Sequence, residues 1–522
     1  MKVLGAVRRS QRFVARLAGG LVGVLAWSPA SGLVCEDPAD LAARAPASSD
    51  LVIVIDDAAG QVRTPAGRAL REALWASGIL KDTSNAWREL AQAIDLPPDR
   101  AFDELLGRRL MLVIEQGTSP KWALLSDISS DTQVTLRKKL GASPRRFSGV
   151  PILSLEHGRF EMAVASGRSP TGRATLMLAP ASSGDLFDSM IGVLNGGRAQ
   201  EPLGRTCGFE HARAMEKPSI LLFLRREAGC LAVGARPTDR GWDARVVGEP
   251  EALGLSRTTR IEAWSSEPFR SLQSDALLAF MGTPSTVATP LRVTRLVSMP
   301  AAMESAHDRQ FMAIKRLPED VRGRVGDGSR EVLALTMGFE NAGIVPDPVG
   351  GLASFLEGFG LGRTVLEAVE PGEVRTSPVE GSVRAKLEPL FGASPVVSWA
   401  FCGGAGESNR NADSWGWWLL GVAPGRAADR VSGSELTERA CQAVSVDHPE
   451  GSVRRRLSIG VVRPSAIDEW LSESSPAVDD RSSGLMRRLD RLSWDLWLEE
   501  PGRVVGQVEV RMTMPESTPS RP

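Results

Sequence analysis

The 522-residue chain contains no tyrosine, which excludes every mechanism that needs a phenol as nucleophile, proton donor or phosphate acceptor. Lysine (8) and asparagine (5) are scarce beside 54 arginines, a bias that a GC-rich genome explains. The four histidines, His157, His211, His307 and His448, are too far apart in sequence for a helical metal-binding pair. We therefore expect no metal and no cofactor.

Motifs of the common hydrolases and nucleotide-binding proteins are also missing. The chain has no G-x-S-x-G, H-E-x-x-H, S-x-x-K or P-loop pattern. Two glycine-rich stretches, 358–362 and 403–407, lack the spacing that seats a pyrophosphate at a helix N-terminus and are interpreted as loops. The remaining acid/base candidates are Asp56 and Asp57, which end a predicted strand, and the cluster at 447–450 around His448.

The N-terminus has the pattern of an export signal. Lys2 and four arginines precede an uncharged stretch from Leu17 to Trp27, and small residues suited to signal peptidase follow. We interpret residues 1–32 as a signal peptide and expect an exported protein without a membrane-spanning segment after cleavage. Cys35 is a poor candidate for lipidation, because Val34 precedes it. The formal net charge of -1 argues against nucleic acid as a partner.

Five cysteines in an oxidising compartment allow two disulfides and one leftover thiol. The predicted pairs are Cys207 with Cys230 and Cys402 with Cys441, because each pair lies within one predicted module. Reduced, buried cysteines are an equally good interpretation of the same residues.

The hydrophobic pattern predicts an α+β protein with predominantly antiparallel sheets and flanking helices. Leu51–Ile55 reads as a buried strand. A hairpin at 109–126 followed by a helix, and a hairpin at 150–165 followed by a strand at 175–178 and a helix, then extend to about residue 200. We predict α+β modules at 43–200, 201–370 and 371–515, with a disordered tail at 516–522.

Two further features concern the second half of the chain. Trp122-Ala-Leu-Leu and Trp417-Trp-Leu-Leu start similar strand patterns, which suggests a degenerate tandem repeat that equates these two strands. A helix is expected near Ala301–Ile314, before a strand at Val332–Gly338. The C-terminus predicts a hairpin whose strands are Leu492–Leu498 and Val504–Met512.

Several segments of the first 200 residues are familiar. The residues at 45–57, 64–70, 102–107 and 148–152 resemble a class of exported bacterial proteins that carry a domain of unknown function. Weaker similarity to the same class occurs near Asp275–Met281 and in the predicted final hairpin. The resemblance implies a signal peptide followed by repeated α+β sheet modules, and it implies no catalytic residues.

The tryptophans are the most unusual positive feature. Trp415, Trp417 and Trp418 lie beside a polar loop, where an exposed group would bind a sugar or a protein partner and a buried group would fill the core. Burial decides between these interpretations, and core filling is favoured. The sequence as a whole predicts a non-catalytic protein of the envelope or cell surface that binds an unknown protein or envelope component. The alternatives are a carrier of an apolar ligand and a hydrolase that uses carboxylates such as Asp56 and Asp57.

Overall fold

A computed structural model gives the structure of the protein, and only part of the chain is described by it. The described residues are 37–68, 91–92, 96–97, 101, 104–105, 107–117, 121–140, 145–155, 160–165, 174–194, 201–206, 208–253, 255, 264–266, 269–270, 273, 276–282, 310–316, 333–342, 373–378, 384, 388, 391, 395–403, 415–424, 437–442, 453–474, 487–499 and 502–513.

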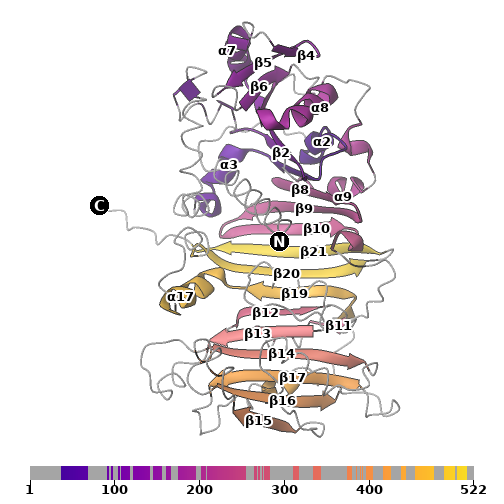
Figure 1. Cartoon of the computed structure of the whole chain (residues 1–522), viewed down its shortest axis with the longest axis vertical. Helices are drawn as coiled ribbons and strands as arrows, with labels where there is room; N and C mark the ends of the chain where they lie inside the picture. Colours follow the sequence, from indigo (N-terminus) through magenta and orange to yellow (C-terminus); the bar gives the residue numbers. More distant parts are fainter. Residues whose placement is uncertain are drawn as a thin grey trace, which may run out of the picture. The chain divides into compact units, whose positions relative to one another are not determined.

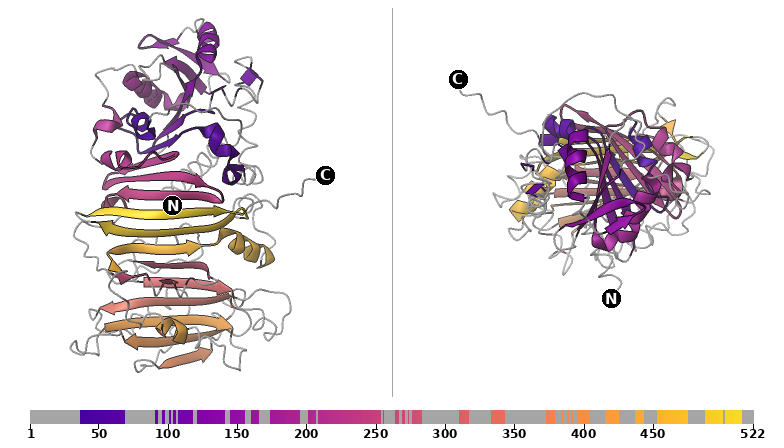
Figure 2. Two further views of the ribbon diagram at one scale, coloured as in Figure 1. Left: turned by 180° about the vertical axis from the view of Figure 1, so that it is seen from behind. Right: turned by 90° about the horizontal axis from the view of Figure 1, so that it is seen from above.

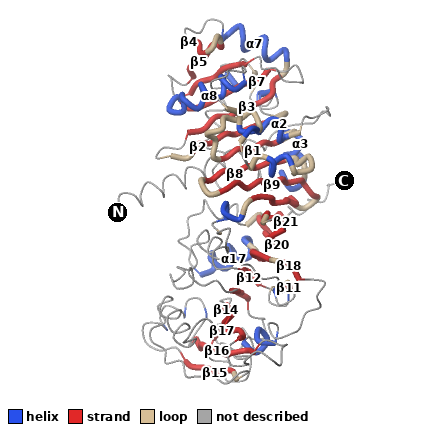
Figure 3. Tube along the Cα trace, turned by 90° about the vertical axis from the view of Figure 1, so that its right-hand side faces the viewer, coloured by secondary structure: helices blue, strands red, loops and turns tan. Residues whose placement is uncertain are grey.

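Antiparallel sheet dominates the part of the chain that the structure describes, as predicted. Of the 21 strands in that part, 19 belong to extended antiparallel ladders, and β11 (Trp264–Ser265) and β18 (Val453–Arg454) form a small pair of their own. Strands far outnumber helices in Figure 3. The protein is therefore predominantly β rather than the α+β class expected from the sequence.

The chain folds into two compact units, which are described separately. Unit 1 comprises 1–252, 479–490 and 503–522, and unit 2 comprises 253–478 and 491–502. The helices and 3-10 turns described in unit 1 are α2 (Pro38–Ala42), α3 (Ala58–Arg63), α7 (Ser130–Leu140), η2 (Ala181–Ser183), α8 (Gly184–Leu194), η3 (Leu203–Arg205), α9 (Glu210–Arg213) and η4 (Pro250–Leu253). Its strands are β1 (Leu51–Ile55), β2 (Leu110–Glu115), β3 (Lys121–Ile128), β4 (Arg145–Phe147), β5 (Val150–Leu155), β6 (Phe160–Ala165), β7 (Ala174–Pro180), β8 (Ile220–Arg226), β9 (Gly229–Thr238), β10 (Gly241–Gly248) and β21 (Arg503–Met512).

Strand β1 is the centre of the sheet in unit 1. It pairs along its whole length with β2 on one side and β8 on the other, and the antiparallel order is β4-β5-β6-β7-β3-β2-β1-β8-β9-β10-β21. The strands β8, β9, β10 and β21 of this order are labelled side by side in Figure 1. Because Val52 and Val54 point to one face and Ile53 and Ile55 to the other, β1 contributes to a core on each side. Helices α2, α8 and α9 cover the first face, and α7 covers the second.

The last strand of the chain closes unit 1. Eight residue pairs join β10 to β21, from Gly241↔Arg511 to Gly248↔Val504. Strand β10 pairs with β9 along one edge, so β21 provides the hydrogen-bonded partner for the other edge of β10. Residues about 260 positions apart in sequence must therefore meet before this part of the sheet is complete, which makes the pairing a late and costly step in loop-closure terms.

Unit 2 contains a second antiparallel sheet. Its strands are β12 (Ala276–Gly282), β13 (Gln310–Arg316), β14 (Leu333–Ala342), β15 (Val374–Pro378), β16 (Pro395–Gly403), β17 (Trp415–Pro424), β19 (Arg456–Val462) and β20 (Leu489–Glu499), with helix α17 (Pro464–Ser474). The order is β15-β16-β17-β14-β13-β12-β19-β20. These strands, salmon to yellow, lie side by side in Figures 1 and 2.

The two units repeat one topology. The order β5-β6-β7-β3-β2-β1-β8-β9 in unit 1 matches β15-β16-β17-β14-β13-β12-β19-β20 in unit 2, strand for strand and in the same succession along the chain. The predicted pairing of Trp122 with Trp417 is wrong in register. Trp122 lies on β3, whose counterpart is β14, whereas Trp417 lies on β17, the counterpart of β7. A four-residue sequence match cannot outweigh the strand order.

The ladders also align the two units residue by residue. Ala-Pro ends both β7 (179–180) and β17 (423–424), and Ser-Asp precedes both β1 (49–50) and β12 (274–275). The Ala-Pro pairs fix which residue of β17 corresponds to each residue of β7. Following the register from β7 through β3 and β2 to β1, and from β17 through β14 and β13 to β12, makes Ile55 the counterpart of Phe280. The Ser-Asp pair gives the same offset of 225 positions independently, since 274 minus 49 and 280 minus 55 are equal.

Other predicted boundaries differ from the structure. The boundary predicted at 200/201 falls inside unit 1, because β8, β9 and β10 extend the sheet that β1 begins. The helix expected near Ala301–Ile314 is wrong over its described part, since Gln310–Arg316 forms strand β13. Phe311, Met312 and Ala313 are all buried between β12 and β14, and burial on both faces of a central strand removes the alternation that distinguishes a strand from a helix.

The close approach of β10 and β21 predicts that a methyl group added at Gly241 destabilises the protein. A Cβ at Gly241 would overlap the carbonyl oxygen of Val510, which is backbone and cannot rotate away, whereas a Cβ at Gly184 meets nothing within 4 Å. We expect Gly241→Ala to lower the free energy of unfolding by about 1–3 kcal/mol and Gly184→Ala to change it by less than about 0.5 kcal/mol. Urea denaturation of both variants tests this, and equal stabilities would contradict the tight ladder.

Candidate functional site

Asp56 and Asp57 follow β1 in a turn that is fixed at several points. Asp57 adopts a left-handed conformation (φ 47°), and its side chain caps α3 by accepting a hydrogen bond from the Gly60 backbone N–H at 3.0 Å. The Asp56 backbone N–H donates to the Ser219 carbonyl, and the N–H of Ala58 donates to that of Arg108. Asp57 therefore has a structural role as a cap, and the same turn holds Asp56 in place.

Asp56 meets two charged residues from neighbouring strands. Arg109, which precedes β2, donates from Nε to Oδ1 of Asp56 at 3.3 Å, and its Nη1 lies 3.8 Å from Oδ2 of Asp127 on β3. The side chains of Arg109 and Asp127 are 7% and 9% exposed, whereas Asp56 is 20% exposed. The three residues form a mostly buried ion triad, in which Asp56 is the member most accessible to solvent.

The triad belongs to a row of polar residues that runs across the strands near their ends, on the face of the sheet that α8 covers. Antiparallel register places one residue from each of five neighbouring strands or strand ends in this row: Ser219, Asp56, Arg109, Asp127 and Thr175. The corresponding residues of unit 2 are Ile459, Met281, Phe311, Gly338 and Leu419. In unit 2 the row is therefore apolar, and all of its side chains other than the glycine belong to one hydrophobic cluster.

The packing in unit 2 explains how the charges are replaced there. The Phe311 ring occupies the space above Gly338, where a Cβ would overlap it, and lies 5.6 Å from the Trp417 ring. The same backbone ladder thus accommodates either an aromatic core or an ion triad. Replacing a buried ion triad with well-packed apolar residues is often neutral or stabilising, so stability alone does not account for the charges in unit 1.

Polar contacts also fix the end of β3 beside the triad. Ser129, one residue beyond β3, accepts a hydrogen bond from the Thr132 backbone N–H at the start of α7. The hydroxyls of Ser129 and Thr132 both lie 3.1 Å from Oε2 of Glu104, to which they donate. This capping network holds the segment between Asp127 and α7 to the chain that leads into β2.

Trp417, predicted as part of a binding surface, lies in the core. Its side chain is 3% exposed and packs in the hydrophobic cluster of unit 2, so it is not available as an exposed platform. Trp415 and Trp418 lie on the same strand, but their side chains are outside the described residues. A role for those two in binding stays a prediction.

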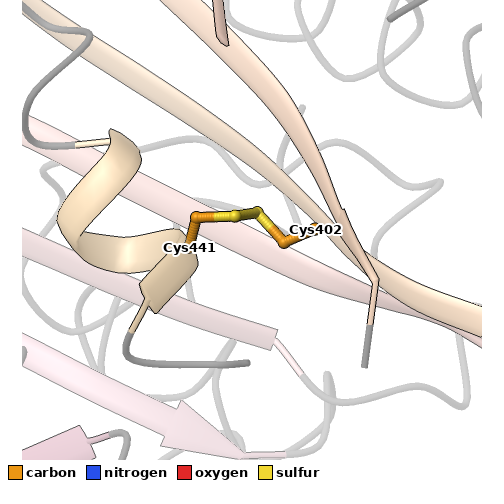
Figure 4. The surroundings of a disulfide bond; sticks show 2 residues. All are labelled: Cys402 and Cys441. Atoms are coloured by element: carbon orange, nitrogen blue, oxygen red, sulfur yellow. A yellow bond between two sulfur atoms is a disulfide. The ribbon is translucent and has the colours of Figure 1, made fainter. Parts of the chain in front are cut away.

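One predicted disulfide is present. Cys402, on β16, is bonded to Cys441, in the helical residues 437–442 that follow β17 (Figure 4). A buried hydrogen bond of 2.7 Å between the hydroxyls of Ser398 and Thr437 holds the same helix to the same strand. Cys230 is buried on β9, and its predicted partner Cys207 lies outside the described residues, as does Cys35.

The remaining sequence candidates give no site. The acid/base cluster at 447–450 and the glycine-rich stretches at 358–362 and 404–407 lie outside the described residues. Within the described part of the chain, no three His, Cys, Asp or Glu side chains are grouped as a metal site. No helix in that part has the length and apolarity to cross a bilayer.

Sequence reasoning identified Asp56 but missed Arg109 and Asp127. The available signal was one charged residue at one end of each of two apolar strands: Arg109 before Leu110–Ile114 and Asp127 after Ala123–Leu125. Charged residues at strand ends usually mark turns, so register is needed to show that these two face Asp56.

Comparisons with known proteins give no relative. No family model, no curated protein and no solved structure matches the chain.

The three residues of the triad can be replaced with the corresponding residues of unit 2. We expect Arg109→Met, which leaves two carboxylates without their buried cation, to cost about 3–5 kcal/mol of unfolding free energy. The triple variant Asp56→Met, Arg109→Phe, Asp127→Gly installs the residues of unit 2 and should be far more stable than Arg109→Met, within about 2 kcal/mol of wild type. Urea denaturation compares the three proteins, and a triple variant less stable than Arg109→Met would show that the fold of unit 1 needs the charges.

Proposed function

We propose that the protein is exported to the envelope or cell surface and acts there as a non-catalytic binding protein, with its binding site in unit 1. The observation that carries the proposal is the ion triad, which stands where the repeated topology in unit 2 has an apolar core. Unit 2 forms the matching ladders without these charges, and Asp56 is the member of the triad most accessible to solvent. A partner that offers a hydrogen-bond donor or a positive charge fits this carboxylate.

The disulfide supports the proposed location. Bonds between cysteines persist in oxidising compartments and are rare in the cytosol of most organisms. The Cys402–Cys441 bond joins a helix to the sheet in unit 2, so an oxidising environment strengthens the fold directly.

The arrangement of the triad favours binding over hydrolysis. A hydrolase with two carboxylates needs both groups to face the scissile bond, one as an acid and the other as a base or nucleophile. Here Arg109 lies between Asp56 and Asp127 and interacts with both carboxylates. Such a group is suited to holding a fixed charge pattern for recognition rather than to exchanging protons.

Export can be tested through the disulfide. We expect the chain made with residues 1–32 to be recovered from the periplasm or medium with Cys402 linked to Cys441, and a chain lacking those residues to stay in the cytoplasm with both thiols reduced. Peptide mapping by mass spectrometry without reductant measures the link. Recovery of the complete chain in the cytoplasm with reduced thiols would contradict export.

Binding can be tested with the exchanged triad. Immobilised wild-type protein should enrich one or more envelope components at least about tenfold over the triple variant, a difference of about 1.4 kcal/mol in binding. Asp57→Asn serves as a matched control, because it removes a neighbouring exposed charge while preserving the cap. Equal enrichment by wild type and the folded triple variant would contradict a site at the triad.

A further inference from the structure

A second charged group in unit 1 also stands where unit 2 is apolar. Glu161 lies on β6, and the register from the Ala-Pro pair at 179–180 gives it Val396 as its counterpart. Only 5% of Glu161 is exposed. Its neighbours at alternate positions, Ala163 and Ala165, belong to the core on the face covered by α8, so Glu161 points toward the same face.

Glu161 is only half satisfied by its partner. Arg145, on the short strand β4, forms an ion pair with Oε1 of Glu161. The other carboxylate oxygen, Oε2, is buried and has no hydrogen-bond partner among the described residues. A buried acceptor without a donor is costly, so this oxygen requires an explanation.

Helix α8 carries a second incompletely paired carboxylate. Oδ1 of Asp188 is buried and also has no partner in the described part of the chain. Burial raises the pKa of Asp188, the charge of Arg145 lowers it, and the charge of Asp185 raises it again. Asp185 is itself paired with Lys121 at 2.9 Å, whereas Arg145 is the ion-pair partner of Glu161 and its charge lowers the pKa of Asp188.

We propose that Arg145, Glu161 and Asp188 form a binding site for a protonated primary amine. Two carboxylates beside one guanidinium leave one negative charge in excess when both are ionised, which a single positive charge neutralises. An ammonium group carries three donors in a compact arrangement and can supply hydrogen bonds to both buried oxygens. The two unpartnered oxygens are buried, and the side chain of Arg145, the ion-pair partner of Glu161, is 48% exposed.

The composition of the site favours an amine over a metal ion. Calcium takes six to eight oxygen ligands, whereas this group offers two carboxylates next to a fixed positive charge. The site uses none of the triad residues, so an experiment that contradicts one of the two proposed sites leaves the other unaffected.

The test is a titration of the purified full-length protein with chosen probes at constant ionic strength. Putrescine, Nα-acetyl-lysine amide and glucosamine carry a primary ammonium group and represent a polyamine, a protein side chain and an amino sugar. Tetramethylammonium carries the charge without donors, and calcium chloride tests for a metal. We expect at least one amine to bind saturably and raise the melting temperature by about 2–5 °C at roughly ten times its Kd, and tetramethylammonium to have no such effect.

Variants assign the effect to the site. Asp188→Asn should reduce amine affinity at least tenfold and should itself raise the melting temperature at neutral pH, because it removes a carboxylate whose ionised form burial disfavours. Glu161→Gln should have the same effect on affinity, and if it fails to fold, Asp188→Asn decides alone. Asp185→Asn is the matched control, since it removes an exposed charge from the same helix and should retain binding.

Any one of the following results would overturn the proposal. These are an equal effect of tetramethylammonium, calcium binding tighter than that of the amines and lost in the same variants, and no saturable effect of any amine up to about 100 mM. Retention of amine binding by Asp188→Asn would also overturn it.

Discussion

Backbone pairing around one central strand in each unit is the constraint on which the rest of the structure depends. Strand β1 in unit 1 and β12 in unit 2 each hold a neighbour on both edges, and five further strands extend each matching ladder. The ladder fixes which side chains share a face and which row they occupy. It does not fix their chemistry, and so the same topology can hold charges in one unit and an aromatic core in the other.

The comparison between units separates what the fold needs from what it merely tolerates. Phe311 and Met281 show that the row at the strand ends can be filled with apolar side chains, and Val396 shows the same for the position of Glu161. In unit 1 both places carry buried ionisable groups, which bring a desolvation cost. Buried ionisable groups at positions that the other unit fills with apolar side chains are the best candidates for function, and here two such groups lie on the face of one sheet that α8 covers.

The sequence predicted the individual hairpins well because their signals are local. Alternating or continuous apolar runs bounded by glycine and proline identify the strands β2, β3, β5, β6 and β7 and the last two described strands, β20 and β21. The strand order could not be predicted, since β1 pairs with β8 across about 170 positions and no local pattern records that contact. For the same reason Asp56 could be singled out as a candidate, whereas its partners Arg109 and Asp127 could not.

The two units also secure a helix to the sheet in different ways, and this difference bears on where function resides. In unit 2 the helix after β17 is held to β16 by the Cys402–Cys441 bond and the Ser398–Thr437 hydrogen bond. In unit 1 the corresponding helix, α8, is held by apolar packing of Phe187, Met190 and Ile191, with Asp188 among its half-buried residues. A covalent link resists displacement of the helix, whereas packing permits small adjustments around a bound group. In unit 1 the helix on the face that carries the ion triad and Glu161 is therefore held to the sheet by packing, whereas its counterpart in unit 2 is also held by a covalent link.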